Sequence, residues 1–302
     1  MWFKNVQLFR FVAPDSFPAA LEDSLRAHPY RSCASMDMRS LGWVSPLGPD
    51  AEALAHGVGT CVMVSACVEE KLLPAAVVRQ AAAEKIASIE AEQAHKLGAK
   101  RRREIKDQVV DELLPRAFSR LRTTYAYWDL PNGWLIVDAA TPKKADELAE
   151  LLIKSVEGLH LRPVRPQESP SSVMTQWLRE GDAAGGFTID TDCELVAPTD
   201  EGATARFSRH NLDSNEIRAH IEAGKCATRL ALTWDDRISF VLTEDFQLKR
   251  LAFLDVVQEA SERQGAEGAA EQFDADFALM SAEFARLLPA LLAAMGGEAQ
   301  PV

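Results

Sequence analysis

The chain has 302 residues, of which 47% are hydrophobic and 26% are charged, and its formal net charge is −12. This apolar content is enough for a substantial core and excludes a chain that is disordered throughout. The longest apolar stretch, 287–295, contains Pro289 and is far shorter than the ~20 residues of a membrane-spanning helix, so we expect no transmembrane segment.

The first residues lack the basic region, apolar core and cleavage site of a signal peptide, so we expect a cytoplasmic protein. Residues 4–11 alternate apolar and polar side chains, as a half-buried strand does. Ser16 is a candidate helix cap, with Pro18 at an early helical position. Residues 31–59 are rich in proline and glycine and are predicted as loops, whereas 60–68 are predicted as a buried strand.

A helical hairpin is predicted next. Residues 75–97 combine strong helix formers with an apolar stripe, and Gly98 is a candidate C-terminal cap. A second stripe with four-residue spacing ends at Leu113, and Pro115 is expected to break that helix. We therefore expect an antiparallel hairpin that projects from the body and carries the basic run 100–103 near its tip.

The same region is basic, whereas the chain as a whole is acidic. Between Lys71 and Arg122, twelve lysines and arginines face seven acidic residues, a net charge of +5 in a chain whose total is −12. The field of such a cluster survives opposite charge that lies beyond the Debye length of ~8–10 Å, so the cluster is suited to a polyanion. An ordinary solvated helical face is the alternative.

A ββαβ run follows the hairpin. Residues 123–129 and 134–138 are predicted strands joined by a turn, 142–156 is a predicted helix, and 159–164 is a predicted strand. This order predicts an α+β fold of mixed antiparallel sheets and helices.

The proline-containing segment 165–172 is the predicted boundary between two α+β regions. The N-terminal region, 1–165, includes the hairpin with its flanking residues as 75–122, and the C-terminal region is 166–302. The elements expected in the C-terminal region are a short helix around Trp177, a strand at 187–189, a helix capped by Asp213 or Ser214, a hairpin of 228–234 and 237–242 across Asp235-Asp236, a strand at 249–254, and an amphipathic helix from about Glu271.

The side chains that could carry chemistry define no catalytic site. The five cysteines are odd in number and widely spaced, so we expect reduced, buried thiols. No histidine pair, nucleotide-binding loop or nucleophile elbow is present. Asp274 and Asp276 point in different directions on a predicted helix, and a metal-dependent nuclease acting through them is one alternative hypothesis. We expect no enzymatic activity, no cofactor and no metal.

The basic cluster lacks a motif that reads base edges, such as a zinc finger or a basic leucine zipper. Lysines and arginines without such a motif favour contacts to phosphates, which carry no sequence information. A protein-interaction scaffold that uses the basic hairpin to bind an acidic partner is the other alternative. Phe118 lies between Arg116 and Arg120 directly after the predicted helix break, and is a candidate interface anchor.

Several longer strings of residues are distributed from one end of the chain to the other. These strings are Trp2-Phe3-Lys4-Asn5, Gly42-Trp43-Val44 with Pro46-Leu47-Gly48, Glu69-Glu70-Lys71-Leu72-Leu73-Pro74, Leu113-Leu114-Pro115-Arg116-Ala117-Phe118-Ser119-Arg120, Ile221-Glu222-Ala223-Gly224-Lys225, Phe273-Asp274-Ala275-Asp276-Phe277 and Gly296-Gly297-Glu298-Ala299. Together and in this order they resemble the RdgC family of recombination-associated proteins.

The resemblance implies a nucleoid-associated, ring-shaped homodimer that encircles double-stranded DNA without sequence preference and limits RecA-dependent recombination. Single-stranded DNA is a further candidate partner. The predicted hairpin would correspond to the family's protruding finger, and Phe118 would lie at or near a subunit contact. Residues 206–211 depart from the family by having fewer lysines than expected.

Two sets of cations are therefore candidate DNA contacts. The set in and beside the hairpin is Lys96, Lys100, Arg101, Arg102, Arg103, Lys106, Arg116 and Arg120. The set that could line the hole of a ring is Lys143, Lys144, Lys225, Arg229, Lys249 and Arg250.

Overall fold

The computed structural model describes residues 1–198, 202–262 and 268–300. The strands within these ranges are β1 (Val6–Val12), β2 (Arg39–Val44), β3 (Ala55–Val58), β4 (Cys61–Leu72), β5 (Phe118–Asp129), β6 (Trp134–Asp138), β7 (His160–Pro163), β8 (Phe187–Val196), β9 (Thr204–Phe207), β10 (Cys226–Trp234), β11 (Ile238–Thr243) and β12 (Leu248–Phe253). The helices are α1 (Leu21–Arg26), α2 (Ala75–Gln93), α3 (Ala99–Leu113), the 3-10 helix η1 (Leu114–Arg116), α4 (Pro142–Ser155), α5 (Pro170–Glu180), α6 (Asn215–Glu222), α7 (Asp255–Glu262) and α8 (Ala269–Ala294).

All of these strands belong to one antiparallel sheet with the order β2-β4-β5-β6-β1-β12-β11-β10-β8-β9, to which β3 is added beside β4 and β7 beside β1. The predicted mixture of helices with antiparallel sheet is confirmed. β1 joins the N-terminal and C-terminal halves of the sheet, because it pairs with β6 on one side and contacts β12 through Val6 and Leu248 on the other. The domain boundary predicted at 165–172 stays a prediction.

Helices cover both faces of the sheet in one half and a single face in the other. Met63 and Val64 are neighbours in β4 and point to opposite faces, so each belongs to a different core. The core around Met63 includes α8, and the core around Val64 includes α1 and α4. Helices α5, α6 and α7 all add side chains to the α8 core. The α4 face of strands β8 to β12 is therefore left without a helical cover among the described residues.

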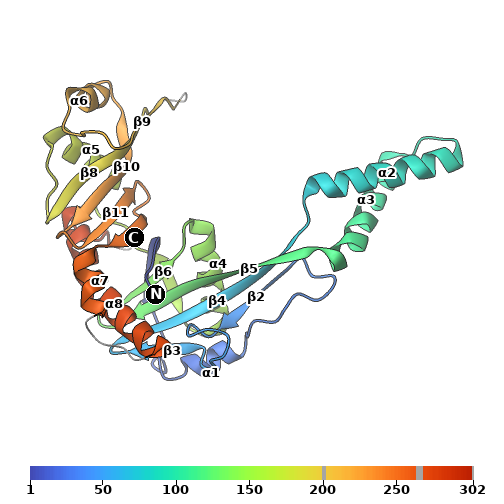
Figure 1. Ribbon diagram of the computed structural model, residues 1–302, viewed down its shortest axis with the longest axis horizontal. Coiled ribbons are helices and arrows are strands. Elements are labelled where there is room, and N and C mark those ends of the chain that lie inside the picture. Colours follow the sequence, from blue (N-terminus) through green and yellow to red (C-terminus); the bar gives the residue numbers. More distant parts are fainter. Residues whose placement is uncertain (199–201, 263–267, 301–302) are drawn as a thin grey trace.

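The molecule has a crescent outline (Figure 1). The C-terminal half forms one arm, α2 and α3 form the other, and α4 lies on the inner side between them. Because α4 packs on the sheet face opposite α8, the uncovered face of β8 to β12 is also on the inner side. We call this side the inner face.

We call the helices α2 and α3 (75–113) of the second arm the finger. The finger projects from a two-stranded ribbon. The ribbon is formed by β4 and β5, paired from Cys61 opposite Asp129 to Leu72 opposite Phe118. Between the two helices lies a small separate core, made chiefly by Val78, Ala82, Ile105 and Val109. The predicted helical hairpin and its apolar stripes are confirmed.

The ends of the finger helices differ from the prediction. The first helix ends at Gln93, not at residue 97, and Ala94 takes the left-handed conformation with φ 55°. Gly98 is the N-cap of α3, not the C-cap of α2. The loop between them is held by Glu90, whose carboxylate accepts the N–H of Leu97 at 2.7 Å, an interaction that spans seven residues and leaves no local pattern.

Strand β5 begins at Phe118, five residues earlier than predicted. Phe118 and Arg120 therefore lie on the ribbon and not on the helical hairpin, which the sequence extended to residue 122. The apolar alternation of β5 starts only where the strand enters the body, because its first residues are exposed on both faces.

Further corrections concern short elements. Ser16 does not cap a helix; residues around it form turns, and α1 begins at Leu21 with Ala20 as N-cap. The segment 31–59 contains two strands, β2 and β3, which pair with β4. A Cβ at Gly42 would collide with the backbone of Tyr30, so β2 depends on a tertiary contact that its proline- and glycine-rich context hides. Strand β9 and helix α7 were also missed, and β8 is longer than the predicted 187–189.

The remaining elements match the prediction closely. Ser214 caps α6 by accepting a hydrogen bond from the N–H of Ile217 at 3.5 Å. The β10–β11 turn places Asp235 and Asp236 at φ 51° and 50°, as a tight hairpin requires. All five cysteines are free, as predicted, but burial was predicted correctly only for Cys61, Cys67 and Cys193, because Cys33 and Cys226 are partly exposed.

Helix α8 is long and apolar enough, by length and composition, to cross a membrane, which the sequence prediction did not anticipate. Half of its most apolar window is buried inside the protein. Phe277, Phe284 and Leu288 are among the side chains that it contributes to the larger core. The apolar character of α8 is thus the character of a core helix.

Candidate nucleic-acid interface

The predicted contact residues lie in the finger, the ribbon and the inner face of the body, apart from Lys225, whose contact is with α6. All are exposed apart from Lys144, Lys225 and Lys249, which are half-buried. The basic run predicted near the tip, residues 100–103, does begin α3 beside the loop that joins the two helices.

Two of the finger cations have partners within the hairpin. Arg102 lies 2.8 Å from Glu90 and also donates to the carbonyl of Leu97 at 3.1 Å, so it braces the loop. The N–H of Leu97, more than the charge of Arg102, holds the pKa of Glu90 below its usual value. Arg101 forms an exposed ion pair with Glu104 at 2.8 Å.

The other finger cations that were predicted as DNA contacts are not neutralised. Within the described residues, no carboxylate lies within ion-pair distance of Lys96, Lys100, Arg103 or Lys106. The first turn of α3 has no acidic residue, although the helix dipole favours negative charge there. This arrangement opposes helix stability and concentrates positive potential at the tip, which suits an anionic ligand.

The ribbon presents arginines to the α4 side of the sheet. Arg120 lies 3.5 Å from Glu70, its cross-strand neighbour. Arg122 and Arg39 each lie 2.8 Å from Glu147 of α4, which fixes the ribbon to the inner face of the body. Arg116 is exposed at the end of η1.

Beside these arginines is an exposed apolar patch. Phe118 is 84% exposed, and Leu72, directly opposite in the ribbon, is 45% exposed. Val77, at the start of α2, is 48% exposed. Apolar side chains gathered at this exposure are typical of a surface that another protein covers.

The uncovered sheet face contains a depression of about 180 Å³ that brings several cations together. Its lining includes Arg229, Lys249 and Arg250, which the sequence predicted, and Arg206, which it did not. Arg206 was missed because β9 was not predicted, and nothing local indicates that this segment forms the outer strand beside β8.

The remaining predicted cations lie outside the depression. Lys143 and Lys144 are in the first turn of α4 on the inner side of the crescent. The ammonium group of Lys225 lies 3.3 Å from Nδ1 of His220, just before β10 begins. The structure thus divides the six residues of the second predicted set and does not form them into one cluster.

The two aspartates considered for a nuclease make structural contacts. Asp274 lies 2.6 Å from Nε2 of His56 in β3. Asp276 pairs with the amino group of Met1 and accepts a hydrogen bond from Gln272 at 2.9 Å. Across the described ranges, no three His, Cys, Asp or Glu residues are grouped so that they could hold a metal ion.

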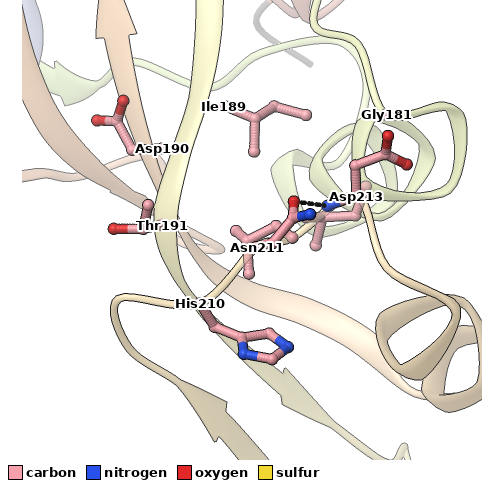
Figure 2. Close-up of a pocket in the computed structure, with 9 residues that line it drawn as sticks. Gly181, Ile189, Asp190, Thr191, His210, Asn211 and Asp213 are labelled. Atoms are coloured by element: carbon pink, nitrogen blue, oxygen red, sulfur yellow. Dashed lines mark hydrogen bonds between the residues drawn. The ribbon is translucent and has the colours of Figure 1, made fainter.

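A second cavity, of about 160 Å³, lies where α5 ends beside β8 and the 210–213 loop (Figure 2). Asp190 accepts hydrogen bonds from Thr233 at 3.0 and 3.1 Å, and burial raises its pKa. Asn211 accepts the N–H of Asp213 at 3.1 Å, and His210 points away from these residues. The carboxylates and the histidine therefore do not converge on one point.

Fold and site define a class of protein: a crescent-shaped α+β chain with a projecting basic finger, whose inner face carries cations although the chain is acidic overall. A family model described as "Putative exonuclease, RdgC" matches residues 1–298. The chain belongs to the RdgC family of recombination-associated proteins.

Three relatives, each called recombination-associated protein RdgC, illustrate the similarity. The chain is 47% identical to the protein of Dechloromonas aromatica over 302 residues, covering 99% of this chain and 98% of the relative. It is 46% identical to that of Burkholderia cenocepacia, covering 99% and 97%. It is also 46% identical to that of Herminiimonas arsenicoxydans, covering 99% of each chain. The resemblance noted in the sequence is confirmed.

Proposed function

We propose that the chain binds duplex DNA without sequence preference, through phosphate contacts from the finger and the inner face. The observation that carries this proposal is the placement of charge. A chain of net charge −12 keeps unpaired cations at the finger tip and gathers others in a depression on the inner face. Phosphate contacts of this kind position a protein on DNA and release counterions.

We further propose that two chains form a ring-shaped dimer around DNA. One crescent is open on its inner side, and in this proposal a second copy completes the enclosure of the duplex. The apolar patch of Phe118 and Leu72 supports this assembly, because it lies at the base of the finger, on the same side of the ribbon as Arg120. An acidic exterior would disfavour DNA on the wrong side of such a ring.

In the cell, such a protein would limit RecA-dependent recombination by occupying DNA in the nucleoid of the cytoplasm. Duplex DNA is the proposed partner, and single-stranded DNA is a further one. The proposal includes no cleavage of DNA and no cofactor, and the contacts of Asp274 and Asp276 support that part of it.

DNA binding by the unmodified protein at several salt concentrations tests the proposal. The logarithm of the association constant should fall linearly with the logarithm of salt, with a slope of about −0.9 for each phosphate contacted. Unrelated duplex sequences should give the same affinity, and Mg²⁺ should produce no cleavage. An affinity that does not change between low and moderate salt would contradict the proposal.

The ring predicts a difference between DNA forms. A closed ring should persist on circular DNA and slide off the ends of linear DNA of the same sequence, which a wash at moderate salt followed by gel analysis measures. Equal retention on both forms would argue against encirclement while leaving DNA binding intact.

Phe118→Ser should weaken the dimer, because it removes an exposed aromatic side chain that contributes little within one subunit. The mass in solution should shift toward the monomer at concentrations where the unmodified protein is dimeric. Val12→Ser is the matched control, because Val12 is 67% exposed at the far end of β1. A dimer that survives Phe118→Ser unchanged would remove this patch from the subunit contact.

A further inference from the structure

Two carboxylates line the inner-face depression, and one of them, Glu194, stands in a row with its cations. The other, Asp192, accepts the hydroxyl of Ser208 at 3.0 Å and the N–H of Arg209 at 2.9 Å. Glu194 in β8 is directly opposite Arg206 in β9 on one side and Arg229 in β10 on the other. Residues paired in this way share a sheet face, so the three side chains form a row across the strands. Glu194 and both arginines line the depression, together with Lys249 and Arg250.

The contacts of Glu194 hold it in that row. Its carboxylate lies 2.5 Å from Nε of Arg206 and accepts the hydroxyl of Thr228 at 3.1 Å. The Glu194 side chain is 14% exposed, whereas that of Arg206 is 75% exposed. Burial raises the pKa of Glu194, but the hydrogen bonds from Arg206 and Thr228 and the nearby charge of Arg229 outweigh it, so the pKa is lowered and the carboxylate is ionised at neutral pH.

The neighbouring cations are not occupied in the same way. In the part of the chain that the structure describes, no carboxylate lies within ion-pair distance of Lys249 or Arg250. The depression therefore combines two cations without an ion pair, Lys249 and Arg250, with Arg206, which is paired with Glu194, and Arg229, whose charge acts on Glu194 from the opposite strand. An incoming phosphate is attracted by Lys249 and Arg250 and meets the charge of Glu194 beside the two arginines.

We propose that Glu194 is an internal competitor for DNA phosphate, which pairs with Arg206 in the free protein, offsets the nearby charge of Arg229 and lowers the affinity of the inner face for DNA. This inference rests on the proposed DNA binding. The ligand is one backbone phosphate of a polymer, because about 180 Å³ is well below the ~300–1,000 Å³ of pockets that enclose a whole small molecule. Glu194 thus lowers affinity at this point and favours release over tight, fixed binding.

Glu194→Gln tests the proposal, because glutamine keeps the size of the side chain and can still accept the hydroxyl of Thr228. DNA affinity at ~0.15 M salt should rise roughly three- to tenfold, and the salt dependence should steepen by about one contact, because a freed arginine becomes available to a phosphate. Thermal unfolding of the free protein should show that the variant is folded. An unchanged or lower affinity of the folded variant overturns the proposal.

Asp213→Asn is the matched control. It removes one negative charge from the same half of the chain, where Asp213 pairs with Arg218 outside the depression. An equal rise in affinity with this control would show that the effect of Glu194→Gln comes from the net charge of the chain and not from the position of Glu194, and would overturn the proposal. The unmodified protein distinguishes failure of the proposed DNA binding from failure of the role of Glu194. If the unmodified protein shows no salt-dependent DNA binding, the proposed function is wrong. If it binds DNA and Glu194→Gln has no effect, only the inference about Glu194 is wrong.

Discussion

Replacing Arg229, Lys249 and Arg250 together by alanine should weaken duplex binding roughly 10²-fold at ~0.15 M salt and reduce the salt slope by about 2.7, the equivalent of three phosphate contacts. These cations share one depression on the inner face, so a single stretch of backbone can meet them all. Their removal should leave folding intact, because Arg229 and Arg250 are exposed and Lys249 is only half-buried. Fluorescence anisotropy with a labelled duplex at several salt concentrations measures both quantities.

The matched control removes three other cations, Arg165, Arg179 and Arg218. Arg179 and Arg218 lie on α5 and α6, which pack on the opposite sheet face, and Arg165 follows β7. This variant has the same net charge but should lose much less affinity. If the two triple variants bind equally weakly, net charge rather than the inner face determines binding.

The finger requires its own variant, and the contacts within the hairpin decide which residues this variant should replace. Arg102 stabilises the loop of the finger, so a loss of DNA affinity on its replacement could come from a changed loop structure and not from a lost phosphate contact. Lys100, Arg103 and Lys106 are exposed and avoid this difficulty. Loss of DNA affinity in this triple variant would place DNA at the finger, whereas unchanged DNA affinity with loss of an acidic protein partner would support the scaffold alternative.

Phe277→Ala should lower the free energy of unfolding by about 3–5 kcal/mol, because it leaves a cavity in the larger core. Phe277 is 1% exposed, and its ring contacts Tyr127 edge-to-face with the centroids 5.3 Å apart. The contact joins α8 to β5, so its loss should loosen the C-terminal helix from the N-terminal half of the sheet. Urea denaturation followed by tryptophan fluorescence measures the change.

Phe118→Ala is the control for this experiment, since it makes the same substitution at a side chain that is 84% exposed. Its effect on unfolding of the monomer should stay within ~0.5 kcal/mol. Any effect that depends on protein concentration reports the subunit contact instead. A loss below ~1 kcal/mol in Phe277→Ala would mean that α8 is not anchored as the structure shows.

Elements with strong local patterns were predictable. The stripes of the finger and the apolar face of α8 repeat with the period of a helix, and the β10–β11 turn is marked by the adjacent residues Asp235 and Asp236. The strands β2, β3 and β9 were not predictable in this way. β3 and β9 have only four residues each, and none of the three strands shows a clear alternation of buried and exposed side chains. They are stabilised by pairing with the longer strands β4 and β8.

The same division applies to the candidate site. The basic finger and the exposed Phe118 are readable from composition and from the helix break at Pro115, because charge density and chain breaks are local properties. The roles of Glu90 and Glu147 have no local signature in the sequence. Glu90 contacts Leu97 and Arg102, and Glu147 contacts Arg39 and Arg122.

The sequence by itself determined the family of this protein, its mixed α+β character and the position of its basic finger. Only the tertiary structure decided that Arg206, Glu194 and Arg229 form one row, that this row lies on the inner face, and that several predicted cations lie outside it. The physical reason is that a run of charge is a property of neighbouring residues. A phosphate site is a property of strands that the chain brings together, and strand order and register depend on pairing between distant segments.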